Sequence, residues 1–109
     1  MIAESPEVLE RPLTIGEKAK LFPLSFWMRL GAKMKPQCFG TTFDGVGTCA
    51  IGAVRDAIGL PLRDGYIRDF FPQLNKIVDE QQLVYHITLK NDAGMTREQI
   101  ADWLESIGY

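Results

Sequence analysis

The sequence predicts a single compact all-α domain of four to six short helices, and three observations support this. The chain has 109 residues, which suits one domain, and 46% of them are hydrophobic, which is enough for one core. Apolar residues recur at three- and four-residue spacing in several segments, as they do on one face of a helix. Capping residues, glycines and prolines separate these segments into short helical lengths.

The N-terminal residues are expected to form an arm outside this domain. Residues 1–13 contain Pro6 and Pro12 and too few apolar residues to pack on their own. We therefore expect a flexible arm over 1–13 and a single helical domain over 14–109.

Two helices are expected before the middle of the chain. Thr14 and Glu17 have the spacing of a capping box, and the short helix that they begin should stop near Phe22, before a proline. Ser25 is a suitable N-cap for a longer helix that runs to about Lys35. The apolar stripe of that helix consists of Leu24, Trp27, Met28, Leu30, Gly31 and Met34.

The middle of the chain is expected to contain a loop followed by a third helix. Residues 36–48 include three glycines and are too irregular for a strand. Thr48 is a suitable N-cap for a helix from Cys49 to about Ile58, and Gly59 is a typical C-terminal stop.

Two expectations concern the residues within and just after that helix. Gly52 lies within it, where glycine costs about 1 kcal/mol relative to alanine, and this indicates a close helix crossing. Asp64 is expected to cap a short helix from Gly65 to Phe71, which Pro72 should end.

Residues 79–91 allow two interpretations. Apolar and polar residues alternate over 83–89, which is typical of a half-buried strand and would make the fold α+β. However, residues 79–82 form a good helix entry, and Leu83 and Ile87 keep helical spacing. Because a lone strand needs a partner and the sequence offers no second convincing one, we favour the helix.

The last helix has the clearest pattern. Thr96 and Gln99 form a capping box, and Gly108 ends the helix. Its apolar stripe consists of Ile100, Trp103, Leu104 and Ile107. We expect a core centred on Trp27, Met28, Leu30, Ile51, Val54, Ile58, Ile87, Ile100, Trp103 and Leu104.

The chain offers few ligands for a metal. Cys38, Cys49 and His86 are its only cysteines and histidine, and their spacing matches no zinc pattern. We therefore expect no metal and no cofactor. The apolar runs are too short to cross a membrane, and the acidic start lacks the apolar region of a signal peptide. This indicates a soluble, cytoplasmic protein, in which two free thiols are favoured over a disulfide.

Charge is distributed unevenly along the chain. Residues 11–37 contain six basic residues and a single acidic one, whereas 38–109 contain six basic and ten acidic residues. Such a division suits a solvated helix face, an anionic partner or a self-complementary dimer. No nucleic-acid-binding motif accompanies it, so nucleic acid is not an expected partner.

Cys49 is the residue that most resembles a catalytic group. It lies at the expected start of a helix, where free N–H groups and the helix dipole stabilise a thiolate. Cys49, His86 and then Asn91 or Asp92 follow the order of a cysteine-hydrolase triad. Because a cysteine and a histidine occur at such separations in many chains, a small packed side chain is the favoured interpretation of Cys49.

Several motifs resemble those of a family of small bacterial and phage-associated proteins. They are Leu24-Ser25 with Arg29-Leu30-Gly31-Ala32, Pro36-Gln37 with Phe39-Gly40, Cys49-Ala50-Ile51-Gly52-Ala53, and Asn91-Asp92 with Thr96-Arg97-Glu98-Gln99-Ile100-Ala101-Asp102-Trp103-Leu104. The resemblance implies a compact, mainly helical domain and favours a helix over 79–91. It implies no particular activity.

The residues around the last two helices are expected to be structural. Asn91 tolerates the left-handed conformation that ends a helix, and Gly94 permits the turn that follows. Asp92 should lie near the N-terminus of the last helix, within reach of Arg97, and Glu98 in its first turn suits the helix dipole. Asp92→Ala should then lower the melting temperature and leave binding intact.

Two functions follow as hypotheses. The first is a small non-enzymatic interaction or regulatory module that binds a protein partner or itself. The alternative is a cysteine-dependent hydrolase or thiol-sensitive protein that uses Cys49 and His86, for which Cys49 should alkylate below the usual thiol pKa of about 8.5.

Overall fold

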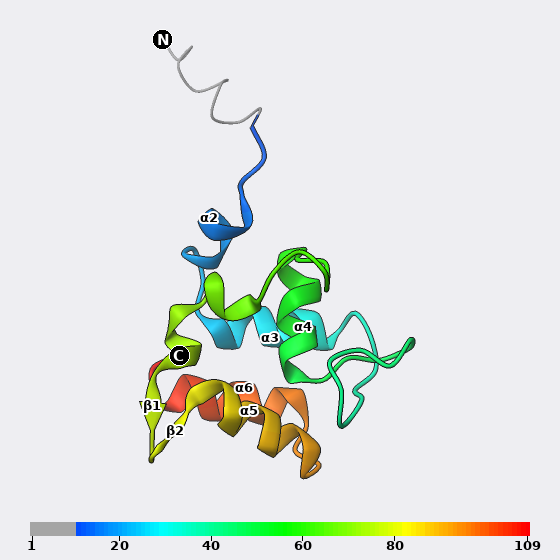
Figure 1. The fold of residues 1–109 in the computed structure, drawn as a ribbon, viewed down its shortest axis with the longest axis vertical. Coiled ribbons are helices and arrows are strands. Elements are labelled where there is room, and N and C mark those ends of the chain that lie inside the picture. Colours follow the sequence, from blue (N-terminus) through cyan, green and yellow to red (C-terminus); the bar gives the residue numbers. More distant parts are fainter. Residues whose placement is uncertain (1–10) are drawn as a thin grey trace.

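A computed structural model describes residues 11–109 and confirms the mainly helical fold (Figure 1). The first ten residues of the expected arm lie outside this range. The elements are α2 (Ile15–Ala19), α3 (Leu24–Ala32), α4 (Ala50–Ile58), the 3-10 turns η1 (Ile67–Asp69) and η2 (Pro72–Asn75), the strands β1 (Ile77–Val78) and β2 (Gln81–Gln82), α5 (Leu83–Asp92) and α6 (Arg97–Ser106). No described helix is both long and apolar enough to span a bilayer.

Helix α2 begins as the sequence predicts, but the start of α3 differs. The N–H of Glu17 donates to Thr14 Oγ1 at 3.1 Å, and the N–H of Thr14 donates to Glu17 Oε1 at 2.8 Å. Pro23, and not Ser25, is the N-cap of α3, because Ser25 is buried and donates its N–H to the carbonyl of Tyr109. The helix also ends three residues before the expected Lys35.

Helix α3 lies at the centre of the fold, because it packs against both α4 and α6. Its close approach to α4 occurs at Gly31, where an added Cβ would lie 1.7 Å from the carbonyl oxygen of Ala53. The expectation of a helix crossing at Gly52 was therefore wrong. Gly52 is confined by the preceding loop instead, since a Cβ there would lie 2.4 Å from the carbonyl oxygen of Thr42.

The start of α4 also differs from the expectation by one residue. Cys49, and not Thr48, is the N-cap, and its Sγ accepts the N–H of Gly52 at 3.5 Å. Thr48 is buried and its hydroxyl accepts a hydrogen bond from Arg97, so it is engaged by a residue far along the chain. Gly59 ends the helix in the left-handed conformation, as expected.

The segment between α4 and the hairpin forms two 3-10 turns, and the expected helix from Gly65 to Phe71 is absent. Pro72 begins η2 and does not end a helix, because a missing N–H costs nothing in a first turn. Phe71 is completely buried between the two turns. The sequence pattern predicted a helix here because it does not show that the side chain of Phe71 is inserted into the core. That insertion determines the path of the backbone.

Residues 77–92 combine a short hairpin with a helix. Strands β1 and β2 pair in antiparallel fashion, with Ile77 opposite Gln82. Asp79 and Glu80 form the turn with positive φ angles of 47° and 71°. The helix that we favoured is present from Leu83 onward, so the alternating residues 83–89 are helical and the short strands lie before them.

Most of the expected core is buried as predicted. Leu30 is the exception, because 40% of its surface is exposed, and Ile51 and Trp103 are half-buried. The core also contains large side chains outside the expected set, among them Ile67, Phe71, Leu74 and Leu83. Ile67 and Leu74 belong to the 3-10 turns and Phe71 lies between them, and these short turns carry no helical repeat.

Candidate functional site

The loop over residues 36–48 is held in a defined shape at its base and near its tip. Thr48 forms backbone bridges to Gln37 and to Phe43. At the tip, Asp44 Oδ1 accepts the N–H groups of Val46 and Gly47 at 2.9 and 2.7 Å. These bonds stabilise the carboxylate and lower the pKa of Asp44 below its usual value. The loop therefore has enough internal bonding to present a fixed surface.

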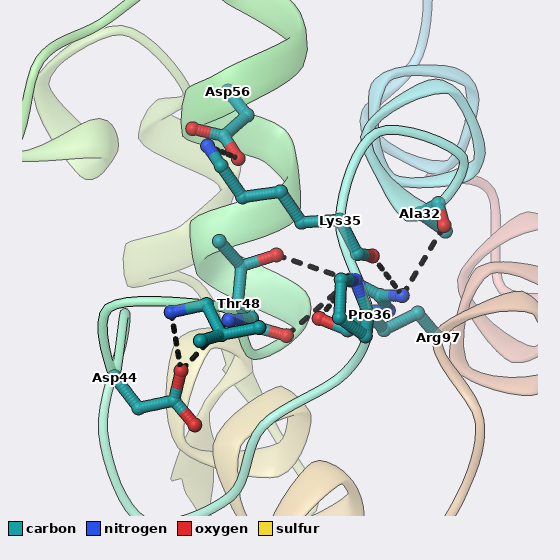
Figure 2. A network of polar contacts seen from close by, with 9 residues as sticks. Ala32, Lys35, Pro36, Asp44, Thr48, Asp56 and Arg97 are labelled. Atoms are coloured by element: carbon teal, nitrogen blue, oxygen red, sulfur yellow. Dashed lines mark hydrogen bonds and ion pairs between the residues drawn. The ribbon is translucent and has the colours of Figure 1, made fainter.

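Arg97 fastens the base of this loop to the helices around it (Figure 2). Its side chain is only 5% exposed and forms no ion pair among the described residues. Its guanidinium donates to the carbonyl of Ala32, the last residue of α3, and to that of Lys35 shortly after it. It also donates to the carbonyls of Pro36 and Thr48 and to the Thr48 hydroxyl. Carbonyl dipoles, one of them at the C-terminus of α3, thus stabilise the buried charge.

Asn91 joins three other segments from a completely buried position in α5. Its Oδ1 accepts the side-chain N–H of Gln37 at 2.9 Å and the N–H of Ala50 at 3.0 Å, and its Nδ2 donates to the carbonyl of Cys38 at 3.0 Å. The expectation that Asn91 ends a helix in the left-handed conformation was wrong. Gly94 has the positive φ, of 101°, and Asn91 is helical.

Asp92 continues this network toward the surface. Its Oδ1 accepts the N–H of Gly40 at 2.9 Å and the side-chain N–H of Asn91 at 3.2 Å. The expected contact between Asp92 and Arg97 is not formed, because Arg97 reaches the opposite side of the loop base. Asp92 is exposed, and Asn91 is not.

Two neighbouring hollows lie beside this network, between α4 and α5, and are together called the groove. Their volumes are about 350 and 320 Å³. Three residues line both hollows, and these are Thr42, Ile51 and Val84. Ile51 and Val84 are half-buried apolar side chains, so the two hollows share an apolar middle section.

One end of the groove is basic. The residues that line it include Arg55, Arg68 and Tyr66, together with apolar side chains, and none of them is acidic. Arg55 is only 6% exposed, forms no ion pair among the described residues, and donates to the carbonyls of Gly65 and Pro61 at 2.9 and 2.5 Å. Burial lowers the pKa of Arg55 from its ordinary value, against the opposing effect of two nearby aspartates.

The other end contains the thiol and the carboxylate. Cys49, Thr88 and Asp92 line it together with Gly40 and Thr41. The structure thus brings three of the expected site residues near one another, since Asn91 lies directly beneath Asp92. Cys49 belongs to the wall of the groove as well as to the cap of α4.

His86 does not belong to this group. Val84 and Thr88 line the groove, and His86 lies roughly 200° around α5 from both of them. Its Nε2 is 2.5 Å from the carbonyl oxygen of Val78, and its ring lies 5.8 Å from that of Trp103. The structure therefore does not assemble Cys49 and His86 into a nucleophile and base.

Both cysteines are free and buried, and no cluster of three or more potential metal ligands occurs over residues 11–109. Cys38 belongs to the base of the loop, where its Sγ is 3.4 Å from the carbonyl oxygen of Thr41. Burial raises the pKa of Cys38, with smaller contributions in the same direction from Asp44 and Cys49.

Three of the six basic residues over 11–37 form ion pairs within the molecule. Arg11 forms an ion pair with Glu17, Arg29 pairs with Asp102 and Glu105 of α6, and Lys35 pairs with Asp56 of α4. These pairs weaken the argument for an anionic partner at this stretch.

Comparison with protein-family models, with curated proteins and with solved structures gave no match for the chain. The groove therefore has to be interpreted from its own chemistry. The sequence analysis singled out Cys49 and Asp92 in it and missed Arg55, Tyr66 and Arg68. A lone arginine on the apolar face of a helix was the one signal available, because such a charge needs either acceptors or a ligand.

Proposed function

We propose that this protein is a small non-enzymatic binding module, whose groove between α4 and α5 holds a short extended segment of a protein partner. The observation that carries the proposal is the apolar middle section, formed by Ile51 and Val84, which lines both hollows of the groove. Ligand sites are typically concave and mostly apolar, with a few polar groups that fix orientation. We place this activity in the cytoplasm of a bacterial or phage-associated system, in line with the free thiols and the motif resemblance.

The charges at the two ends of the groove support an extended occupant. Arg68 lies at one end and Asp92 at the other, with apolar side chains between them. A peptide of a few residues matches this pattern if its ends are polar and its centre is apolar. Catalysis is not part of the proposal, because His86 lies on the other side of α5 from Cys49 and contacts Val78.

The test uses a pool of blocked six-residue peptides with valine or leucine at their central positions. Titration into the ¹⁵N-labelled protein should shift the amide resonances of Thr42, Ile51 and Val84. Val84→Arg fills the apolar middle section and should abolish these shifts. Failure of every peptide to shift these three resonances in the wild-type protein would overturn the proposal.

Self-association is a second candidate, and a different surface favours it. Ile77 and Tyr85 border one shallow hollow, and Leu89 lies one helical turn beyond Tyr85. All three side chains are more than half exposed, as one outward face of β1 and α5. An antiparallel second copy would bury this apolar face of each chain against the same face of the other.

Two variants distinguish the two candidate functions. Leu89→Arg should abolish a dimer in sedimentation analysis and leave the peptide-induced resonance shifts unchanged. Val84→Arg should abolish these shifts and leave the dimer intact. A monomer at every protein concentration tested would eliminate the second candidate without affecting the first.

A further inference from the structure

We propose that the basic end of the groove, formed by Arg55, Arg68 and Tyr66, binds a carboxylate that is attached to an apolar group. This inference rests on the proposed binding role of the groove and specifies the chemistry of its occupant. In a peptide the carboxylate would be an acidic side chain or a free C-terminus.

Arg68 supplies the direct contact. It is exposed in η1, and its guanidinium lies 5.1 Å from the ring centre of Tyr66, whose ring is itself exposed. Stacking on an aromatic face orients the planar guanidinium and reduces the entropy lost when it binds an anion. A guanidinium held in this way presents parallel N–H groups to both oxygens of a carboxylate.

Arg55 supplies a second positive charge from within the wall. Its two carbonyl partners satisfy part of the guanidinium, but its Nε–H is buried without a hydrogen-bond partner. A guanidinium has five N–H donors, so two bonds leave this charge incompletely satisfied. A carboxylate at the mouth of the hollow would offset the desolvation of Arg55 as well as pair with Arg68.

The rest of this hollow explains why the carboxylate should carry an apolar group. Its walls include the side chains of Ile51, Leu62, Ile67 and Val84. Leu62 is more than half exposed, so a ligand would remove its apolar surface from water. Asp92, at the far end of the groove, would repel a second carboxylate and so orient the occupant.

The first experiment uses a compact probe. The ¹⁵N-labelled protein is titrated with 4-phenylbutyrate and, separately, with the neutral 4-phenylbutyramide. The acid should shift the resonances of Tyr66, Arg68 and Val84 and bind about fivefold more tightly than the amide, the effect of one partly desolvated ion pair. Arg68→Gln should remove that difference, and Arg63→Gln, at an exposed arginine that does not line the groove, should preserve it.

The second experiment identifies the source of the carboxylate. Three peptides share an apolar centre and end in a glutamate with a blocked C-terminus, in a glutamine with a free C-terminus, or in a blocked glutamine. If the first peptide binds more tightly than the blocked glutamine peptide, the groove recognises a side-chain carboxylate. If the second binds more tightly, it recognises a terminal carboxylate.

The two proposals fail separately. Equal binding of all three peptides, with equal affinity for acid and amide, would overturn the carboxylate site and leave the peptide groove standing. Shifts from phenylbutyrate alone, with none from any peptide, would overturn the peptide groove and support the carboxylate site. Unchanged acid preference in Arg68→Gln would also overturn the inference.

Discussion

Two buried arginines without carboxylate partners occupy different regions of this domain. Arg97, in the closed junction between α3, the 36–48 loop and α6, donates five hydrogen bonds, four to backbone carbonyls and one to a hydroxyl. Arg55, at the edge of the groove, donates two, although its exposure is nearly the same. The Nε–H of each arginine is buried without a hydrogen-bond partner. The two arginines therefore differ in the number of acceptors around their terminal nitrogens, and in that Arg55 lines a hollow and is open to a ligand.

This difference shows that burial alone does not distinguish a structural charge from a binding charge. The number of acceptors around the guanidinium does, because each unsatisfied donor in a low-dielectric site raises the free energy of the unliganded protein. Substitutions at the closed junction should therefore affect stability, and substitutions at the groove should mainly affect binding.

The largest effect is expected for Arg97→Met. The substitution leaves the carbonyls of Ala32 and Lys35 without donors and removes the buried contacts to Thr48, and should lower the free energy of unfolding by about 3 kcal/mol. Arg97→Lys should recover only part of this loss, because one ammonium cannot reach acceptors on both sides of the loop base. Urea denaturation measures both, and a loss below about 1 kcal/mol would show that the junction does not depend on Arg97.

Asn91→Leu is expected to have the next largest effect. It removes three inter-segment hydrogen bonds at a completely buried position and leaves the N–H of Ala50 unsatisfied. The free energy of unfolding should fall by about 2 kcal/mol, measured in the same way. An unchanged free energy of unfolding would mean that water replaces the Asn91 amide. The closed junction would then be more accessible to solvent than the burial of Arg97 indicates.

Arg55→Met should lower the free energy of unfolding by a smaller amount, about 1 kcal/mol. The removal of a partly unsatisfied buried charge offsets part of the loss of two hydrogen bonds. Its main effect should be on the groove, where the preference for 4-phenylbutyrate over the amide should decrease. Thermal denaturation and the NMR titration measure the two quantities. A loss as large as that of Arg97→Met would remove the distinction between the two arginines.

Asp92→Ala tests the boundary between the two regions. The loss of the acceptor for Gly40 should lower the free energy of unfolding by about 1 kcal/mol, as for a lost cap. Because Asp92 also lines the groove, peptide affinity should change, contrary to the purely structural role that the sequence suggested. Unchanged affinity, together with a lower melting temperature, would restore that role.

The smallest effect concerns the two thiols, one in each region. Cys38 is buried in the closed junction with a raised pKa, so less of it is thiolate at a given pH, and iodoacetamide should modify it more slowly than Cys49. His86→Ala should leave the rate at Cys49 unchanged, since His86 bonds to Val78 instead. Mass spectrometry of the digested protein follows both rates, and a slower reaction of Cys49 in His86→Ala would revive the catalytic hypothesis.

The candidate site was only partly predictable. Cys49 and Asp92 were noticed because each lies at a helix end, where local sequence indicates function or capping. Arg55 and Arg68 were not, because one is a single charge on an apolar face and the other follows no periodic pattern. The roles given to Asn91 and Arg97 were local, whereas all of the hydrogen-bond partners of their side chains except Asp92 lie 41 to 65 residues away in the chain.

The sequence by itself determined the helices with strong local signals. The capping boxes at Thr14 and Thr96, the left-handed Gly59 and the apolar stripes follow from interactions within a few residues. The tertiary structure alone decided that Gly31 is the crossing point of α3 and α4, that Thr48 is an acceptor for Arg97, and that α4 and α5 leave a groove between them. The physical reason is the sequence separation over which each interaction acts. Helix caps and apolar periodicity act within one helix, whereas close packing and buried hydrogen bonds depend on which distant segments come into contact.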